Sequence, residues 1–282
     1  MIIVTGATGQ LGRLVIASLL EKVPKSQIIA VVRNVEKAKD LAALGIQIRQ
    51  ADYNQPDKWD AALQGADKLL LVSSSEIGQR VQQHKTVIDA AKRAGVKLLA
   101  YTSVLHADKS ALGLAGEHRD TEAAIRDSGI PFVILRNGWY TENYAMGVNT
   151  ALSLGAVYGC AGDGRISSAA RADYAEAAAV VLTSENQAGK VYELAGDTSY
   201  TLSEFAAEIS RQSGKAINYV NLPEAEYKKA LLNAGLPEVL AELLANSDTG
   251  VSKGALFDDG KQLSKLIGRP TSALETVVSA AL

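Results

Sequence analysis

The chain has 282 residues, of which 47% are apolar, and its formal net charge is −2. A chain of this size and composition can bury a large core, either as one domain or as one domain with a smaller lobe. The small net charge argues against a nucleic-acid partner, and a single cysteine excludes an internal disulfide.

Other broad classes are also disfavoured. The three histidines lie far apart in the sequence, so no metal site is predicted, and no apolar run is long enough for membrane insertion. A strand is expected at the N-terminus, with no signal peptide before it. We therefore expect a cytoplasmic protein without a metal; the sequence indicates no particular oligomeric state.

A glycine-rich stretch follows the first expected strand, Ile2–Thr5, and leads into a helix that continues to Leu20. This arrangement is typical of the first turn of a dinucleotide-binding fold, where the helix N-terminus faces the pyrophosphate. Glycines permit the tight turn, the close approach of a phosphate and the packing of helix on strand. The alternative is a tight turn without a ligand. The expected cofactor-binding residues here are Gly6, Ala7, Thr8, Gly9, Gln10, Leu11 and Gly12.

The second expected strand, 27–32, ends at Arg33. In dinucleotide folds an acid near this position binds the free ribose hydroxyls of NAD, whereas an arginine accommodates the 2′-phosphate of NADP. The next acid in the sequence is Glu36, so Arg33 favours NADP(H). The alternative is a solvated arginine at the end of a strand.

The following elements continue the alternation of strand and helix. Asp52, after the third strand, either faces the adenine or forms a turn or cap. Ser73, Ser74 and Ser75 follow the fourth strand, where small polar residues fit a ligand crevice. Ser73 and Glu76 also have the spacing of a capping box for the next helix. The remaining strands up to residue 136 are expected over 46–50, 68–72, 96–101 and 131–135, and the helices over 35–43, 56–63, 78–94 and 117–128.

This alternation predicts an α/β fold with a doubly wound parallel sheet, a Rossmann domain over residues 1–138. Helical patterns dominate residues 139–282, which we interpret as a smaller α/β lobe that covers the substrate and allows for a return of the chain to the sheet. Its expected helices are 173–183, 202–212, 224–234, 238–246 and 273–281, and its expected strands are 156–158, 191–194 and 217–220.

Several motifs together resemble one family. They are G-A-T-G-Q-L-G at 6–12, Arg33, Y-T-S at 101–103, His118-x-x-x-Glu122 and R-N-G-W-Y at 136–140. The chain thereby resembles the NmrA-like atypical short-chain dehydrogenases. Within them it is most similar to the bacterial NAD(P)H:quinone oxidoreductases of type 2, and next to the triphenylmethane dye reductases. The S-S-S-E-I-G-Q-R run at 73–80 and R-N-G-W-Y favour the quinone group.

The usual catalytic pair of short-chain dehydrogenases, Tyr-x-x-x-Lys, corresponds by chain order to His118 and Glu122. The i, i+4 spacing places both on one helix face, where the glutamate would favour a protonated histidine. The polar neighbours Glu117, Arg119 and Asp120 favour a solvated helix face instead. No catalytic residue is therefore assigned, and His118 remains the candidate.

A missing acid restricts the substrate. A quinone that accepts hydride becomes a delocalised anion, and a cationic dye is neutralised, so neither needs a positioned proton donor. We expect NADPH-dependent quinone reduction by direct hydride transfer, without flavin. The alternatives are an NADP(H)-binding redox sensor without turnover and a triphenylmethane dye reductase.

The R-N-G-W-Y segment is expected where sheet and lobe meet. Asn137 and Gly138 are expected to contact the cofactor, and Asn137 also the substrate carbonyl. Trp139 and Tyr140 either stack on a planar acceptor or pack within the lobe. Arg171 is expected to contact the cofactor or the lobe interface. Asp173 is expected to be a helix N-cap, and Cys160 has no neighbouring base that would make it a catalytic thiol.

Overall fold

The protein, described here over residues 1–282 from a computed structural model, divides into two compact units. Residues 105–116, which the sequence analysis places in the first domain, lie in unit 2. Residues 171–192, which it places in the lobe, lie in unit 1. Unit 1 contains Met1–Val104, Glu117–Asn137 and Arg171–Tyr192, and unit 2 contains Leu105–Gly116, Gly138–Ala170 and Glu193–Leu282.

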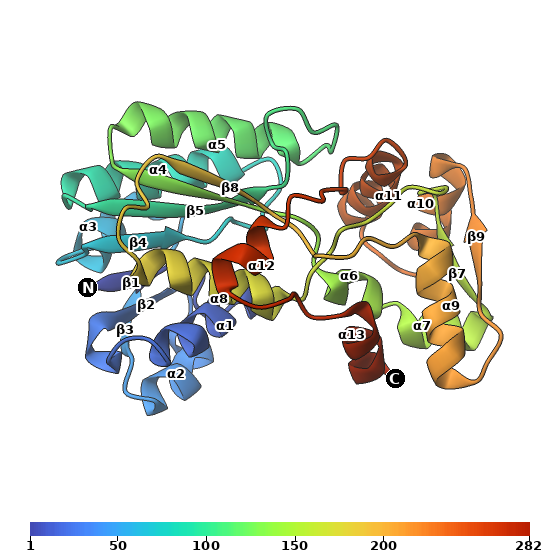
Figure 1. The fold of residues 1–282 in the computed structure, drawn as a ribbon. Helices are drawn as coiled ribbons and strands as arrows, with labels where there is room; N and C mark the ends of the chain where they lie inside the picture. The colour runs from blue at the N-terminus through green and yellow to red at the C-terminus, as the bar shows by residue number, and fades with distance from the viewer. The chain divides into compact units, whose positions relative to one another are not determined.

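The centre of unit 1 is a seven-stranded sheet in the order β3-β2-β1-β4-β5-β6-β8 (Figure 1). All pairs from β3 to β6 are parallel, which confirms the predicted α/β class. In the register, Ile3 of β1 lies between Ile29 of β2 and Leu69 of β4. The strands are β1 Ile2–Val4, β2 Ile28–Val32, β3 Gln47–Gln50, β4 Lys68–Leu71, β5 Leu98–Val104, β6 Phe132–Asn137 and β8 Lys190–Leu194.

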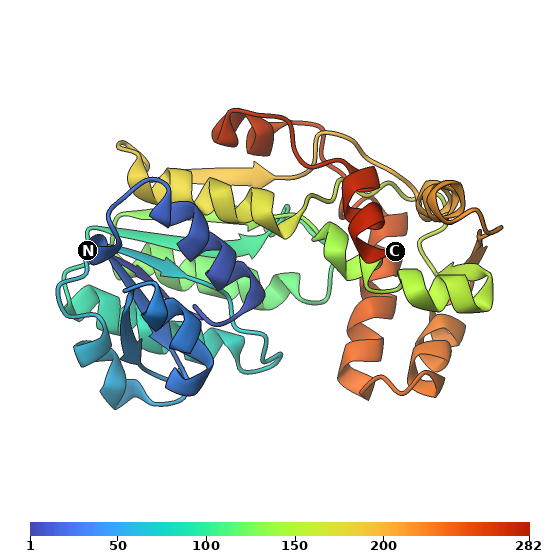
Figure 2. The ribbon, with the colours of Figure 1, turned by 90° about the horizontal axis from the view of Figure 1, so that it is seen from below.

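Helices cover both faces of this sheet, with α4 and α5 on one face and α1 and α8 on the other (Figure 1). Helix α8, predicted for the lobe, packs beside α1 (Figure 2) because its alanine-rich surface, including Ala175 and Ala178, permits close approach. The helices are α1 Gln10–Leu20, α2 Lys39–Ala43, α3 Trp59–Ala62, α4 Arg80–Arg93, α5 Ala115–Ser128 and α8 Arg171–Thr183, with 3₁₀ turns at Lys25–Gln27, Val35–Ala38 and Pro56–Lys58.

Burial of large apolar side chains holds unit 1 together. Ile3, Leu69 and Leu99 are fully buried on the strands, and Trp59 and Leu63 pack against the same core. Each such side chain stabilises the fold by about 1.5–3 kcal/mol. Strand β5 continues three residues beyond the predicted end at Tyr101, because Thr102–Val104 pair with the end of β6.

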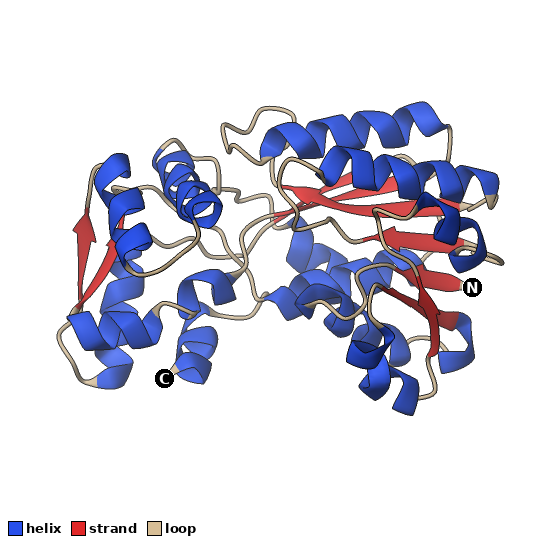
Figure 3. Ribbon diagram, turned by 180° about the vertical axis from the view of Figure 1, so that it is seen from behind, coloured by secondary structure: helices blue, strands red, loops and turns tan.

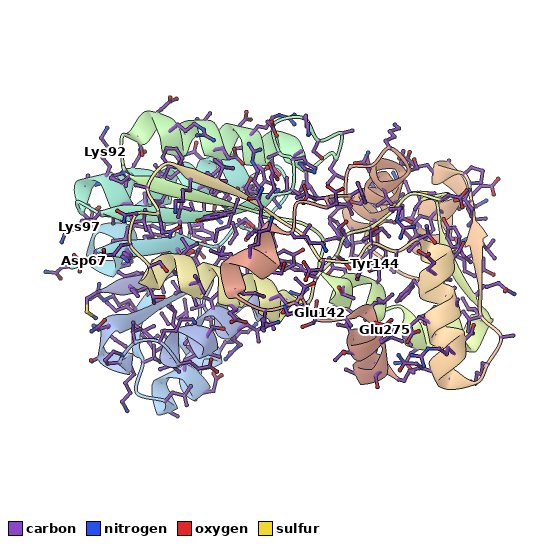
Figure 4. All side chains as sticks on the ribbon, in the orientation of Figure 1. Asp67, Lys92, Lys97, Glu142, Tyr144 and Glu275 are labelled. Atoms are coloured by element: carbon purple, nitrogen blue, oxygen red, sulfur yellow. The ribbon has the colours of Figure 1, made fainter.

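The amino edge of the sheet, where the parallel strands begin, carries different residues from the carboxyl edge, where they end. At the amino edge, Lys97 Nζ donates to Asp67 Oδ1 over 2.6 Å, and the N-terminal ammonium also pairs with Asp67 (Figure 4). At the carboxyl edge, the strands end in the glycine loop, Arg33 and the serine loop. The predicted site residues of unit 1 therefore gather at the edge where such folds bind ligands.

Unit 2 is mostly helical, with one parallel two-stranded sheet (Figure 3). A capping box formed by Thr201 and Glu204 begins α9. Tyr144 of α6, labelled in Figure 4, packs against Tyr200 and Phe205. The elements are α6 Thr141–Ala145, α7 Val148–Leu154, β7 Ala156–Gly159, α9 Leu202–Ser213, β9 Asn218–Asn221, α10 Glu224–Asn233, α11 Glu238–Ser252, α12 Gln262–Ile267 and α13 Leu274–Ala281.

Helix α11 is longer than predicted, because its polar final turns are buried and hydrogen-bonded. Asn246 Oδ1 accepts from the Gly113 N–H over 2.7 Å, and Asp248 Oδ2 accepts from the Cys160 N–H over 3.1 Å. Burial raises the pKa of Asp248 to about 6. No helix of the molecule combines the length and apolar character needed to cross a bilayer.

Candidate functional site

The glycine loop between β1 and α1 is built almost entirely from backbone. Gly6 has φ +57°, which favours glycine, and its carbonyl accepts from the Gly9 N–H over 2.9 Å. A Cβ at Gly12 would lie 2.4 Å from Gly6 O, so only glycine lets α1 begin this close to the loop. Ala7 and Leu11 bury their side chains, and the Ala7 N–H donates to Val31 O over 3.3 Å, which ties the loop to β2.

The N-terminus of α1 is open to an anion. Gly9 is the N-cap and offers no capping side chain, and the first turn contains no acidic residue. The first N–H groups of a helix have no partner within it, so those of Gln10 and Leu11 can donate outward. Arg13, a contact of the loop that its sequence did not predict, donates from Nε to Thr8 O over 3.2 Å and also pairs with Asp40.

Arg33 lies at the end of β2 and has a carboxylate partner that its local sequence does not reveal. Its guanidinium Nη1 lies 3.0 Å from Glu76 Oε1, although the two residues are 43 positions apart. The predicted capping box is wrong, because α4 begins at Arg80 with Gln79 as its N-cap. Glu76 N–H donates instead to Ser74 Oγ, within the loop.

The serine loop 73–75 is held by its backbone. The Ser73 N–H donates to Thr102 Oγ1 over 2.8 Å, and Arg80 Nε donates to Ser74 O over 2.8 Å. The Ser74 N–H donates to His84 Nε2 over 2.9 Å. Ser73 is half-buried and Ser75 is exposed, whereas Ser74 is buried.

His84 belongs to a directed chain of hydrogen bonds. Because Nε2 accepts from Ser74, Nδ1 carries the proton and donates to Thr121 Oγ1 over 3.0 Å. Thr121 in turn donates to the Glu117 carbonyl. Burial lowers the pKa of His84 to about 3, with the nearby Arg80 charge adding to the shift. The imidazole is therefore neutral, as its acceptor role demands.

His118 and Glu122 are buried, so the expectation of a solvated helix face is wrong. His118 Nδ1 lies 2.7 Å from the Tyr101 hydroxyl. Burial, then the charge of Arg80, holds the pKa of His118 well below its ordinary value. The expected effect of Glu122 on His118 is also absent, because Glu122 instead accepts two hydrogen bonds from Arg136, of 2.9 and 2.8 Å, and one from Ser103.

We call these side chains the buried polar cluster. Its members come from β5, β6, α4 and α5. Hydrogen bonds join His84 to Thr121, Tyr101 to His118, and Ser103 and Arg136 to Glu122. Burial raises the pKa of Tyr101, so its hydroxyl keeps its proton. The cluster consists of His84, Tyr101, Ser103, His118, Thr121, Glu122 and Arg136.

Asn137 ends β6 and leaves one atom unsatisfied. Its side chain is 4% exposed, and Oδ1 is buried without a hydrogen-bond donor. Such an acceptor is costly unless a ligand supplies the donor. Asp52, in contrast, makes a turn, since its Oδ1 accepts from the Asn54 N–H over 3.0 Å.

The remaining predicted residues are divided between the two units. In unit 2, the Gly138 N–H donates to Leu194 O over 2.7 Å, and Trp139 and Tyr140 are half-buried. In unit 1, α8 begins at Arg171, so Asp173 lies inside the helix rather than at its N-cap, which corrects that prediction.

Two further kinds of site find no support. Burial raises the pKa of Cys160 to about 11, which makes its thiol a poor nucleophile. No group of three His, Cys, Asp or Glu side chains is arranged to hold a metal ion.

Comparison with known proteins adds the relatives of this chain. The NmrA-like family matches residues 1–277. Quinone oxidoreductase 2 of Escherichia coli (strain K12) is 59% identical over 279 residues, which is 99% of this chain and 98% of that protein.

Two solved structures are also similar throughout. One is an NADPH-dependent quinone oxidoreductase from Escherichia coli complexed with NADPH, with a TM-score of 0.98, 59% identity and 99% of both chains covered. The other is the Citrobacter sp. triphenylmethane reductase complexed with NADP(H), with a TM-score of 0.97, 43% identity and 100% of both chains covered.

Proposed function

This chain belongs to the NmrA-like family, and from that premise we propose that it is an NADPH-dependent quinone reductase that needs no flavin. The observation that carries the proposal is the glycine loop, whose backbone donors and missing side chains suit a pyrophosphate. The 59% identity to a quinone oxidoreductase, and the NADPH held by a structure of equal identity, support the choice of cofactor and acceptor.

The residues of the carboxyl edge fit this cofactor. Residues 6–12 hold the pyrophosphate through backbone N–H groups, and Arg33 accommodates the 2′-phosphate. Ser73–Ser75 line the crevice. Asn137 Oδ1 accepts a hydrogen bond from the nicotinamide carboxamide, which supplies the donor that this buried oxygen lacks. Gly138 and Arg171 complete the proposed cofactor contacts.

The acceptor is a planar quinone. Bound NADPH would supply the hydride, and Trp139 and Tyr140 would hold the ring of the acceptor by stacking. No acid is required from the protein, because the hydroquinone anion spreads its charge over the ring and takes a proton from water. The buried polar cluster agrees with this. Burial lowers the pKa of His118, so its imidazole is neutral, and raises the pKa of Tyr101, so its hydroxyl is a weak acid.

The experiment mixes the purified chain with NADPH and a benzoquinone and follows the loss of nicotinamide absorbance. Quinone-dependent oxidation, with one NADPH consumed per hydroquinone formed and no added flavin, is the expected result. No oxidation with any acceptor would overturn the proposal and leave an NADP(H)-binding redox sensor as the function.

Dye reduction is the second candidate, favoured by the 43% identity to a triphenylmethane reductase over the whole chain. The same assay with a triphenylmethane dye in place of the quinone separates the two. A kcat/KM for the dye greater than that for the quinone would make the chain a dye reductase.

A further inference from the structure

Arg33, the cation that we assign to the 2′-phosphate, already pairs with a carboxylate, that of Glu76. Arg33 lies at the end of β2 with a side chain 68% exposed, and Glu76 lies in the loop after β4 with a side chain 37% exposed. Their nearest atoms, Arg33 Nη1 and Glu76 Oε1, are 3.0 Å apart. A phosphate that approaches Arg33 therefore meets a carboxylate in hydrogen-bond contact with the same guanidinium.

Glu76 is also held independently of Arg33. Its N–H donates to Ser74 Oγ over 3.1 Å, and its Oε2 accepts from Gln83 Nε2 over 2.8 Å. Gln83 is only 2% exposed and its amide also donates to Asn54 Oδ1 over 3.2 Å. These bonds fix the carboxylate beside Arg33 from the side of α4, so it stays near the guanidinium even if the ion pair opens.

We propose that Glu76 is a specificity-determining residue that limits the preference for NADPH over NADH, by competing with the 2′-phosphate for Arg33. The proposal rests on the function proposed above. The phosphate carries up to two negative charges, so it must displace Glu76 Oε1 from Arg33 or lie close to it at an electrostatic cost. NADH presents a neutral hydroxyl at that position and meets no such cost.

The test compares two ligands that differ only in the 2′-phosphate, adenosine 2′,5′-bisphosphate and adenosine 5′-monophosphate. Calorimetric titration of the full chain and of Glu76→Gln gives the four dissociation constants. Glutamine keeps an oxygen for Gln83 and removes the charge. We expect Glu76→Gln to bind the bisphosphate about three- to tenfold more tightly, a gain that shrinks as salt is raised, with affinity for the monophosphate unchanged.

Glu36→Gln is the matched control. Glu36 is also close to Arg33 in the sequence, but it pairs with Lys39, and its side chain is 69% exposed. It removes the same charge without touching the ion pair, so its effect on the bisphosphate is expected to stay within about twofold.

Three outcomes would overturn the proposal. The first is an equal gain in affinity for the bisphosphate in Glu76→Gln and Glu36→Gln, which would indicate a general charge effect. The second is an equal gain of Glu76→Gln for both ligands, and the third is an unchanged affinity of Glu76→Gln for the bisphosphate. Because the titrations contain no quinone, they are independent of turnover. A chain that oxidises NADPH with quinone, but whose Glu76→Gln variant shows no change, would retain the proposed function and lose this inference.

Discussion

The glycine loop at residues 6–12 and the buried polar cluster lie in the same unit and are built in opposite ways. The loop is backbone, partly exposed, and its helix N-terminus lacks capping partners. The cluster is made of buried side chains that satisfy one another, as Glu122 and Arg136 do. Unsatisfied donors indicate a place for a ligand, whereas a satisfied network indicates structure. Substitutions in the loop should therefore change binding, and those in the cluster should change stability.

The largest effect is expected from Glu122→Leu. The change leaves the guanidinium of Arg136, 8% exposed, buried without its carboxylate, and removing one partner of such a pair costs about 3–5 kcal/mol of unfolding free energy. Denaturant unfolding measures it. The double variant Glu122→Leu with Arg136→Met should recover most of the loss. A loss below about 1 kcal/mol would show that the pair is solvated after all.

Gly12→Ala tests the loop. The new Cβ would lie 2.4 Å from Gly6 O, and overpacking of this kind costs about 1–3 kcal/mol. We expect the cost to appear as NADPH affinity lowered by about five- to a hundredfold in titrations. Ala17→Val, at an exposed position of the same helix, is the control and should leave affinity unchanged. Unchanged binding by Gly12→Ala would mean that the loop does not hold the cofactor.

The third prediction concerns pH. An unfolded histidine titrates near 6.5, whereas burial lowers the pKa of His84 to about 3 in the folded protein. Below pH 6.5 the unfolded chain therefore binds a proton that the folded chain does not, and stability falls as pH falls from 6.5 toward 3. His84 alone should lower unfolding free energy by about 2 kcal/mol between pH 7 and pH 5.

Denaturant unfolding at several pH values gives this slope. His84→Gln cannot titrate and still offers an oxygen to the Ser74 N–H, so it should flatten the profile by that amount. His118 shifts in the same direction and should leave a residual slope. An unaltered profile in His84→Gln would contradict a neutral, buried imidazole.

Trp139→Ala tests the binding of the acceptor. Losing a stacked ring costs about 0.5–1.5 kcal/mol, so we expect the KM for quinone to rise by about two- to tenfold and the KM for NADPH to change less. Tyr158→Ala, at an exposed aromatic of unit 2, is the control. The reverse ranking of the two KM values would move Trp139 to the cofactor or to the packing of unit 2.

The smallest effect on turnover is expected from His118→Ala. The variant removes the hydrogen bond between Tyr101 and His118, which should cost about 1 kcal/mol of stability. Because no acid is required, kcat should stay within about threefold of the parent. A fall of several orders of magnitude in kcat, with folding intact, would identify His118 as the proton donor.

The features that the sequence predicted correctly are those set by neighbouring residues. The turn at Gly6–Gly12 and the apolar strands around it depend on local conformation and burial. Glu76 beside Arg33 and the burial of His118 depend on contacts between distant segments, so charged neighbours such as Arg119 were misleading. The same cause explains α8, whose alanine-rich sequence predicts a helix but does not show that this helix packs in unit 1, and α11, whose polar end resembles a loop.

At Asn137 the stability of the ligand-free fold and the capacity to bind a ligand are in conflict. A lone buried oxygen without a donor burdens the ligand-free fold by about 1–3 kcal/mol, which an apolar side chain would avoid. A substitution of Asn137 by an apolar residue is therefore expected to raise the thermal stability of the ligand-free protein. If Asn137 binds the nicotinamide carboxamide as proposed, the same substitution would weaken cofactor binding, so thermal stability and affinity oppose each other at this residue.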